Sequence, residues 1–463
     1  MRMSEQKSIN KMGTKAMLPL LLSMSIPAMF SMLIQALYNI VDSIFVSQIG
    51  PEALNAVSLA DPLQMIVISF AVGTAVGVNS LIARRLGAKR NDEASDAATH
   101  GMVIAVLTWV LFVIIGISFS KLFISLFTDS TTILTYGTQY LHIVLIACLG
   151  CMVSVMGEKT LQATGNMIVP MLTQLLGAVI NIILDPFFIH GYWIFPKLGV
   201  KGAAIATVIA QFCSMFFILS ILIFKKHDIK ISFKNFKMKG QVVWNIYVVG
   251  FPAIIMQCIG SVMVSGINAI ISIFAPTVAV KEAYVNVFGI YFKLQSFVFM
   301  PVFGLSQGTS PIIGYNYGAG NKKRMYQALK LSLVIAAIIM VLGFLLFQFG
   351  SGMLLALFDA NKFTVDLGIP AFKIISLCFV PAAVGITFST LFQAVGKGLR
   401  SMIMSIMRQL LVILPVAFII GSKSLENMWY AFPIAEIFAL IVAILFFINL
   451  VKTDFKKLDN VEE

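Results

Sequence analysis

The sequence predicts an all-α polytopic membrane protein, in which twelve transmembrane helices form two six-helix bundles related by a pseudo-two-fold axis along the membrane normal. Three observations support this fold class: the apolar composition, the recurrence of long apolar runs, and an internal repeat. Of the 463 residues, 59% are hydrophobic and 11% are charged. Soluble domains are about 45–50% apolar and about 25% charged. The composition therefore excludes a soluble enzyme, a nucleic-acid-binding protein and a disordered chain.

Apolar runs long enough to cross a bilayer, which takes about 20 residues, recur along the whole chain. The first run follows a polar segment and exceeds thirty residues, which is typical of a retained span and not of a cleaved signal peptide. The runs predict spans at residues 17–48, 53–82, 95–120, 133–156, 168–190, 200–224, 243–273, 284–313, 326–350, 366–391, 399–420 and 427–451. They divide the chain into an N-terminal segment (1–15), a first bundle (16–224), a basic linker (225–242), a second bundle (243–451) and a tail (452–463).

The basic residues predict the orientation of these segments. With the N-terminus placed in the cytoplasm, 24 Lys and Arg fall in cytoplasmic segments, six in external segments and three within spans. Such a bias follows the positive-inside rule. We therefore expect a multi-pass protein of the cell membrane whose termini and linker are cytoplasmic and lie next to anionic lipid. The net charge of +13 then reflects topology and indicates no nucleic-acid partner.

Two segments of the first bundle recur in the second bundle at one common offset of 231 residues. The Gly-x-x-x-Gly and Gly-Ala patterns of residues 73–88 return at 304–319, and the Gln-Ala-x-Gly pattern of 161–165 returns at 392–396. Because each bundle has an even number of spans, both enter the membrane in the same direction. Two such bundles suit alternating access, in which they rock about a central cavity.

Four acidic residues fall within the predicted spans: Asp42, Asp61, Asp185 and Glu436. A carboxylate at the centre of a membrane costs about 2.5–3.5 kcal/mol on insertion scales, so each needs a partner or a function. Asp61 precedes Pro62, and this pair predicts a helix restart with Asp61 as the N-cap and Pro62 at the first helical position.

The best candidate site combines residues of the first, fifth and sixth spans. The helical rise places Asp42, Asp185 and Thr207 at similar depths, roughly 9, 8 and 10 Å from the outer ends of their spans. Tyr38 precedes Asp42 by four residues and Asn181 precedes Asp185 by four, so each pair shares a helix face. These oxygen atoms predict a site for a coupling cation and for no other cofactor. The ion is either Na⁺, held by Asp42, Asn181, Asp185 and Thr207, or a proton shared by the two carboxyl groups.

Two prolines within spans are predicted to act as structural hinges. Pro27 cannot donate a hydrogen bond to the carbonyl group of Ser23, and Pro186 leaves the carbonyl group of Ile182 without its helical donor. The bend gives the first span a point about which it can move. The freed carbonyl of Ile182 adds one more oxygen near the predicted cation site.

The repeated glycine and glutamine patterns, in two parallel sets of six spans, resemble those of the multidrug and toxic compound extrusion (MATE) transporters. The segment 303–319 is especially similar to the family pattern, and the resemblance extends over about residues 16–452. It implies a secondary active multidrug exporter that moves cationic, amphipathic compounds outward against inward H⁺ or Na⁺.

The predicted cation site also resembles one branch of that family. Residues 38–42, together with Asn181, Asp185 and Thr207, are similar to the cation site of the bacterial and archaeal branch that carries it in the N-terminal half. At the offset of 231, Asn181 and Asp185 correspond to Val412 and Val416, so the site is not repeated.

The interior of the spans offers further candidates for a substrate cavity. Lys293 and Glu436 lie at similar depths and are expected either to pair within the second bundle or to line the cavity. Arg408 lies near enough to the cytoplasmic end to extend its side chain to the membrane surface. The candidate lining residues are Met32, Gln35, Met256, Gln257, Lys293, Met300 and Glu436. The expected partners are small cationic amphipathic compounds and membrane lipid, bound by a monomer.

The sequence fits two other classes of function less well. An intramembrane enzyme finds no His-Glu-x-x-His or Gly-x-Ser-x-Gly motif here, and the sequence has no phosphate-binding loop for ATP. A flippase of lipid-linked precursors would share the two-bundle architecture and remains the alternative. An anionic lipid-linked substrate would require several basic residues in the cavity, and only Lys293, Lys373 and Arg408 fall within spans.

Overall fold

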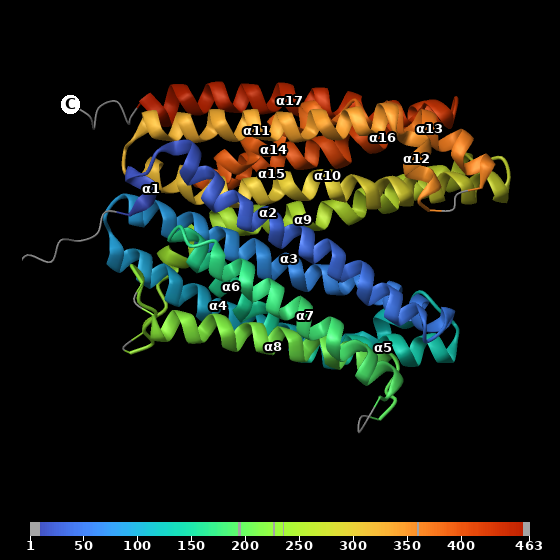
Figure 1. The fold of residues 1–463 in the computed structure, drawn as a ribbon, viewed down its shortest axis with the longest axis horizontal. Helices are drawn as coiled ribbons and strands as arrows, with labels where there is room; N and C mark the ends of the chain where they lie inside the picture. Colours follow the sequence, from blue (N-terminus) through green and yellow to red (C-terminus); the bar gives the residue numbers. More distant parts are fainter. Residues whose placement is uncertain (1–9, 193–195, 226, 235, 359–360, 457–463) are drawn as a thin grey trace, which may run out of the picture.

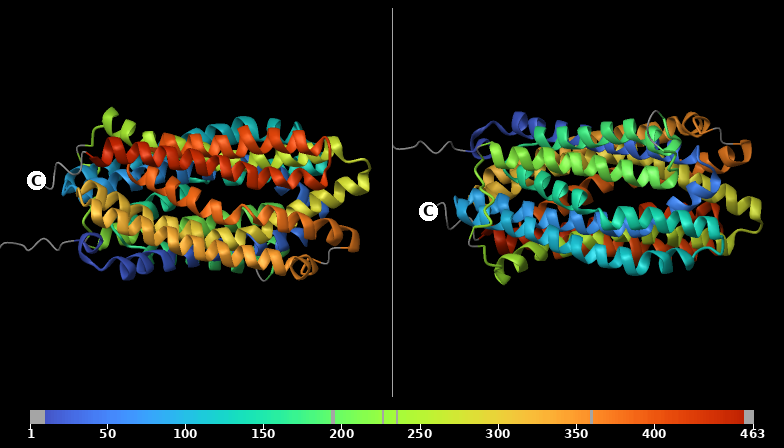
Figure 2. Two further views of the ribbon diagram at one scale, coloured as in Figure 1. Left: turned by 90° about the horizontal axis from the view of Figure 1, so that it is seen from above. Right: turned by 90° about the horizontal axis from the view of Figure 1, so that it is seen from below.

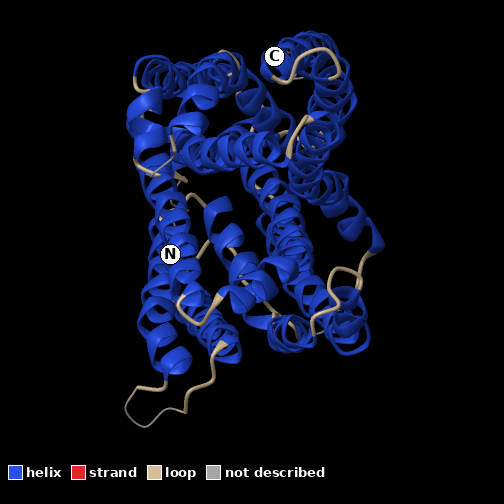
Figure 3. Ribbon diagram, turned by 90° about the vertical axis from the view of Figure 1, so that its right-hand side faces the viewer, coloured by secondary structure: helices blue, strands red, loops and turns tan. Residues whose placement is uncertain are grey.

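The computed structural model describes residues 10–456 except 193–195, 226, 235 and 359–360. This part of the chain consists of helices and connecting loops (Figure 3). The first half contains α1 (Lys11–Thr14), α2 (Met17–Ser47), α3 (Pro51–Gly87), α4 (Asn91–Ser125), α5 (Thr131–Ile146), α6 (Leu149–Ala163), α7 (Ile168–His190) and α8 (Val200–Phe224).

The second half is also helical, with three shorter irregular turns. It contains α9 (Gly240–Phe274), α10 (Val278–Gly318), α11 (Lys322–Phe349), α12 (Ser351–Ala356), α13 (Lys362–Ser376), α14 (Phe379–Ala394), α15 (Gly398–Ile406), α16 (Ile413–Gly421) and α17 (Ala431–Leu450). A π-helical turn, η1 (Met407–Val412), joins α15 to α16. A 3₁₀ turn, η2 (Glu426–Tyr430), precedes α17, and a second π-helical turn, η3 (Val451–Phe455), follows it.

The described residues contain ten candidate membrane spans, and two further spans if each of two bent helix pairs counts as one. The bent pairs are α5–α6 and α13–α14, and each bends by 46°. They occupy corresponding places in the two halves, as the internal repeat predicts. The long helices run roughly along one axis (Figures 1 and 2). The predicted fold class, an all-helical polytopic membrane protein, is confirmed.

The two halves meet through the repeated glycines. Gly77 of α3 packs against α9 so closely that a Cβ atom there would overlap the backbone oxygen of Ile246. On the other side, a Cβ at Gly308 of α10 would lie 2.5 Å from the Ser25 hydroxyl oxygen of α2. The glycines therefore bring helices of different halves into backbone contact. In Figure 1 the two halves lie together near the chain ends, at the left, and diverge towards the right.

Two helix boundaries differ from the prediction. Helix α3 continues through Pro62 without a break, so the predicted helix restart with Asp61 as an N-cap is wrong. Helix α6 continues to Ala163, whereas the predicted span ended at residue 156. Its chain reverses at Gly165, which has a φ of 89° that favours glycine. The extension places Glu158 and Lys159 inside the helix, and both are buried.

Candidate functional site

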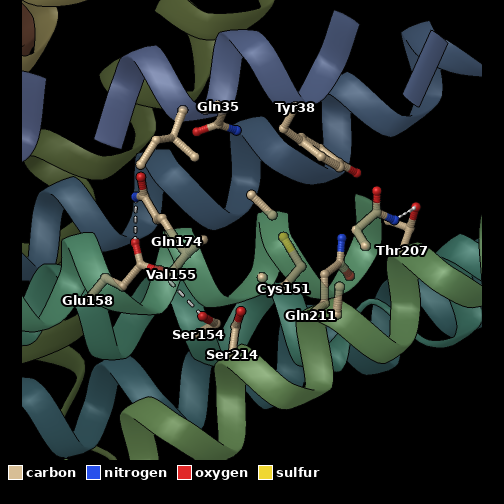
Figure 4. A pocket seen from close by; sticks show the side chains of 15 residues that line it. Gln35, Tyr38, Cys151, Ser154, Val155, Glu158, Gln174, Thr207, Gln211 and Ser214 are labelled. Carbon is tan, nitrogen blue, oxygen red and sulfur yellow. Dashed lines mark hydrogen bonds between the residues drawn. The ribbon is translucent and has the colours of Figure 1, made fainter. Parts of the chain in front are cut away.

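A cavity opens among helices α2, α6, α7 and α8 of the first half (Figure 4). The empty space among its lining atoms, including the open mouth, is about 730 Å³. The lining is mixed, with amide, hydroxyl and carboxyl groups among small and branched apolar side chains. It consists of Ile34, Gln35, Tyr38, Cys151, Ser154, Val155, Glu158, Gln174, Gly177, Ala178, Asn181, Thr207, Ala210, Gln211 and Ser214.

Three residues of the predicted cation site, Tyr38, Asn181 and Thr207, line one end of the cavity. Asn181, Asp185 and Thr207 are all buried. With its amide oriented to satisfy both neighbours, Asn181 donates from its side-chain nitrogen to Asp185 Oδ2 (2.9 Å) and accepts from the Thr207 backbone N–H (3.1 Å). Since Asn181 and Asp185 lie four residues apart on α7, the sequence spacing itself brings the amide to the carboxylate.

Helix α2 completes this cluster. The Asp42 carboxyl group interacts directly with that of Asp185, and the Tyr38 hydroxyl interacts with that of Thr207. The buried Oδ1 atom of Asp42 has no hydrogen-bond partner within the described part of the chain. The structure therefore brings together all five residues of the predicted site, and no basic side chain is among these contacts.

The chemistry of this donor set fits a small hard cation. Two carboxyl groups in contact repel each other when both are ionised, so a proton or a metal cation between them relieves the repulsion. The Asp42 oxygen without a partner, the Asp185 carboxylate and the Thr207 hydroxyl are the oxygen ligands that Na⁺ takes in proteins. The same carboxyl groups can instead share a proton.

The opposite end of the cavity carries a third carboxylate, that of Glu158, which the sequence did not predict. Glu158 accepts hydrogen bonds from Gln174 Nε2 (2.9 Å) and from the Ser154 hydroxyl (3.4 Å). Its neighbour Lys159 is also buried, and its ammonium group donates to Gln162 Oε1 (2.9 Å) and to Gln307 Oε1 of the second half (2.7 Å). The signal that could have revealed both residues is Gly165, because a helix that ends at a glycine must include the residues just before it.

Of the predicted cavity residues, Gln35 lines this cavity. Met32 lies at the contact between the halves, where its sulfur is 2.8 Å from Gln307 Nε2. Met256 approaches Gln393 Nε2 to 4.0 Å, and the Gln257 side chain is exposed. The other predicted cavity residues are likewise absent from its lining, including Met300, which is partly buried on α10.

The predicted pairing of Lys293 with Glu436 is wrong. Glu436 is buried and forms an ion pair with Arg408, whose Nη1 lies 3.3 Å from Glu436 Oε1. The expectation that Arg408 extends to the membrane surface is wrong for the same reason, since its guanidinium turns inward to this carboxylate. Lys293 is exposed, and its ammonium group lies 5.9 Å from the ring centre of Phe358.

Both predicted hinge prolines lie inside helices. Pro27 is in the interior of α2, and Pro186 follows Asp185 in α7. Pro186 removes one backbone donor next to Asp185 of the cation cluster. Pro27 removes one near Ser25, which packs against Gly308 at the contact between the halves.

The duplicated helical architecture, with a cluster of carboxyl, amide and hydroxyl groups beside a cavity of the first half, is that of a multi-pass integral membrane transporter and not of an enzyme, as the family match shows. The profile of the MatE family matches residues 27–187 and 252–419, one segment in each half. The chain belongs to this family, whose members include multidrug efflux transporters.

Individual relatives support the same family. The chain is 27% identical to the FAD transporter of Shewanella oneidensis over 90% of its own length and 91% of that protein. It is 26% identical to the multidrug export protein MepA of Staphylococcus haemolyticus over 89% of each chain. Among solved structures, the outward-facing conformation of a multidrug resistance MATE family transporter matches with a TM-score of 0.87 and 26% identity, over 95% of this chain and 96% of that one.

Proposed function

We propose that the protein is a secondary active exporter of cationic, amphipathic compounds, driven by the inward movement of H⁺ or Na⁺. The observation that carries this proposal is the contact between Asp42 and Asp185, completed by Tyr38, Asn181 and Thr207. Two interacting carboxyl groups without a basic partner bind a cation or a proton and lose their mutual repulsion when they do so. This is the property that a coupling site requires, and it supports a site in the N-terminal half, like that of the bacterial and archaeal branch that the sequence resembles.

The lining of the cavity supports a cationic cargo. Glu158 contributes a carboxylate, and none of the described lining residues is Lys or Arg. Two relatives differ in the cargo that their names give, since one is a multidrug exporter and the other an FAD transporter. A dinucleotide or a lipid-linked precursor carries phosphate groups, which an acidic lining repels. The lining therefore favours organic cations over FAD and over the lipid-linked precursors of a flippase.

Alternating access would link the two ligands. The halves meet closely near the chain ends, through Gly77 and Gly308 and through the Lys159–Gln307 hydrogen bond. The Asp42–Asp185 cluster lies away from this contact. Binding of the ion there neutralises the two carboxyl groups and allows α2, α7 and α8 to close together. If closure reshapes the cavity, the ion and the cargo change each other's affinity by the same factor.

The orientation of the protein is part of this proposal. The bias of basic residues places the chain ends in the cytoplasm. Cysteines introduced at Asn91, at the start of α4, and at Ser130, before α5, should then differ in labelling by an impermeant thiol reagent. Only the cysteine at position 130 should react from outside intact cells, and equal labelling at the two positions contradicts the twelve-span topology.

The coupling site is tested with purified protein in proteoliposomes. Efflux of a fluorescent organic cation is measured under an imposed proton gradient and, separately, under a sodium gradient. Asp42→Asn and Asp185→Asn should insert normally and lose gradient-driven efflux. Glu52→Gln is the matched control, because Glu52 is an exposed carboxylate at the start of the neighbouring helix α3. Full coupling in the Asp42→Asn/Asp185→Asn double variant would exclude this site from the mechanism.

A further inference from the structure

We propose that the Glu158 end of the cavity binds the positively charged nitrogen group of the transported compound. This inference rests on the proposed export function, since it names the residue that recognises the cargo. The site is separate from Asp42 and Asp185, which do not line the cavity. Within the cavity, Glu158 lies at the end away from Tyr38 and Thr207 (Figure 4).

One face of α6 supplies the floor of this site. Cys151, Ser154, Val155 and Glu158 all line the cavity, and their spacing of three, four and seven residues places them in one row along the helix. The Glu158 side chain is almost fully buried, with 5% of its surface exposed. Its hydrogen bonds with Gln174 and Ser154 fix the direction of the carboxylate. A buried carboxylate that faces a cavity from a rigid helix is a preformed site for a cation.

Two further acceptors of the cavity lack partners. The buried oxygen atoms Gln174 Oε1 and Gln211 Oε1 have no hydrogen-bond partner within the described residues. Both side chains line the cavity, Gln174 from α7 and Gln211 from α8 (Figure 4). Unpaired buried acceptors cost free energy, and a ligand with N–H donors removes that cost. One carboxylate with two amide oxygens therefore selects a protonated amine, an amidinium or a guanidinium group.

The apolar part of the lining accounts for the rest of such a compound. Ile34, Val155, Ala178 and Ala210 line the same space, together with the ring of Tyr38. Small and branched apolar side chains accept a hydrophobic body, and an aromatic face attracts a nearby cation. The cargo that fits is an amphipathic cation with N–H groups at one end.

The adjacent Lys159 balances the negative charge of Glu158 without occupying the cavity. Its ammonium group turns away from the cavity and is held by Gln162 and by Gln307 of α10. The positive charge is therefore present on the far side of α6, while the cavity side of Glu158 stays open to a ligand. A direct Glu158–Lys159 ion pair inside the cavity would instead have occupied the carboxylate.

Helix α7 contributes a residue to each of the two proposed cation sites, at different depths along its axis. Gln174 contacts Glu158, and Asn181 contacts Asp185, and these two α7 residues are seven positions or roughly 10 Å apart. Two positive charges at such a distance repel each other in a medium of low dielectric constant. Ion binding at one end therefore weakens cargo binding at the other although the two ligands share no residue, which is the behaviour of an antiporter.

The test measures binding to purified protein in lipid nanodiscs, with ethidium, which carries amino groups, and tetraphenylphosphonium, which has no N–H donor. Glu158→Gln should weaken the binding of both cations at least tenfold, because the charge is lost. Gln211→Leu should weaken ethidium binding several-fold and leave tetraphenylphosphonium binding within twofold of wild type. Glu52→Gln is the matched control, since Glu52 is an exposed carboxylate at the start of α3.

A second measurement keeps Glu158 intact, in case Glu158→Gln does not fold. Cys151 lines the cavity on the same face of α6 as Glu158, about two helical turns before it. In a variant with Ser at Cys148, Cys213, Cys258 and Cys378, ethidium should slow the alkylation of Cys151 several-fold. Unchanged alkylation with saturating ethidium places the ligand elsewhere and overturns the inference.

The outcomes separate this inference from the export function. If Glu158→Gln binds ethidium as tightly as wild type while wild-type efflux is present, the Glu158 site is wrong and the proposed function stands. If Glu158→Gln retains ethidium binding and loses ion coupling, Glu158 belongs to the ion pathway, which also overturns the inference. If the wild-type protein neither binds nor exports either cation, the proposed function fails, and the inference fails with it.

Discussion

The two halves of the protein treat buried carboxylates in different ways. In the first half, Asp42 and Asp185 interact with each other, and Glu158 accepts hydrogen bonds from Gln174 and Ser154. The ammonium group of the adjacent Lys159 is instead bound by Gln162 and Gln307. In the second half, Glu436 is neutralised by Arg408 in a direct ion pair. A carboxylate without a fixed counter-ion can exchange cations, whereas a paired one is already satisfied. Under the proposed function, one half of the duplicated fold would carry the ion chemistry while the other retains a structural ion pair.

The largest effect is expected from removing a charge of the first half. Asp185→Asn should reduce gradient-driven efflux to the background of empty vesicles, because a neutral amide carries no charge to balance the coupling ion and exchanges no proton. Glu436→Gln, assayed at equal amounts of folded protein, should retain most of the efflux. Efflux and protein amount are measured together in proteoliposomes. Loss of efflux in Glu436→Gln with normal efflux in Asp185→Asn would reverse the assignment of the two halves.

The second prediction concerns stability and uses the ion pair itself. Glu436→Gln leaves the half-buried Arg408 without its counter-charge, and breaking a buried ion pair in this way destabilises a protein by up to about 3–5 kcal/mol. The double variant Glu436→Leu/Arg408→Leu removes both charges and should recover most of that loss. Thermal unfolding in detergent measures both. A double variant as unstable as the single one contradicts a simple pairing role.

The same contrast shows how far the sequence could predict the site. The cation cluster was accessible because its residues lie at regular helical spacings and similar depths, which fix their positions once the spans are known. The Glu436–Arg408 pair was not accessible, since it depends on how η1 and α17 rotate towards each other, and η1 is a π-helical turn that shifts the register of side chains. Glu158 was missed through a span that was predicted to end seven residues early.

The fold could be predicted because the membrane allows few alternatives. Apolar length and the internal repeat determined the spans and their order, and the matching 46° bends of α5–α6 and α13–α14 follow the repeat. Interactions between distant residues could not be predicted from hydropathy. The hydrogen bond between Lys159 and Gln307 joins residues that are 148 positions apart, and only the packed structure reveals it.

A third prediction tests the contact between the halves and is smaller in size. Gly308→Ala adds a Cβ atom 2.5 Å from the Ser25 hydroxyl oxygen, and such overpacking costs about 1–3 kcal/mol. Gly289→Ala is the matched control in the same helix, because no atom lies within 4 Å of its added Cβ. This control should be neutral, or stabilising by about 0.5–1 kcal/mol through helix propensity. Equal unfolding temperatures for the two variants would show that α10 moves away from α2 without loss.

The smallest effect is expected at Lys293, although its position inside a predicted span makes it a candidate for the substrate cavity. Its side chain is exposed and does not line the cavity of the first half. Its ammonium nitrogen lies 5.9 Å from the centre of the Phe358 ring. An exposed cation–π contact contributes about 0.5–1 kcal/mol. Lys293→Ala should therefore change both the unfolding temperature and the rate of efflux only slightly, with efflux within twofold of wild type. Lys293→Arg preserves the charge and serves as the control for its electrostatic role. If Lys293→Ala abolished efflux while Lys293→Arg restored it, the second half would hold a functional charge after all, and the division of labour between the halves would be wrong.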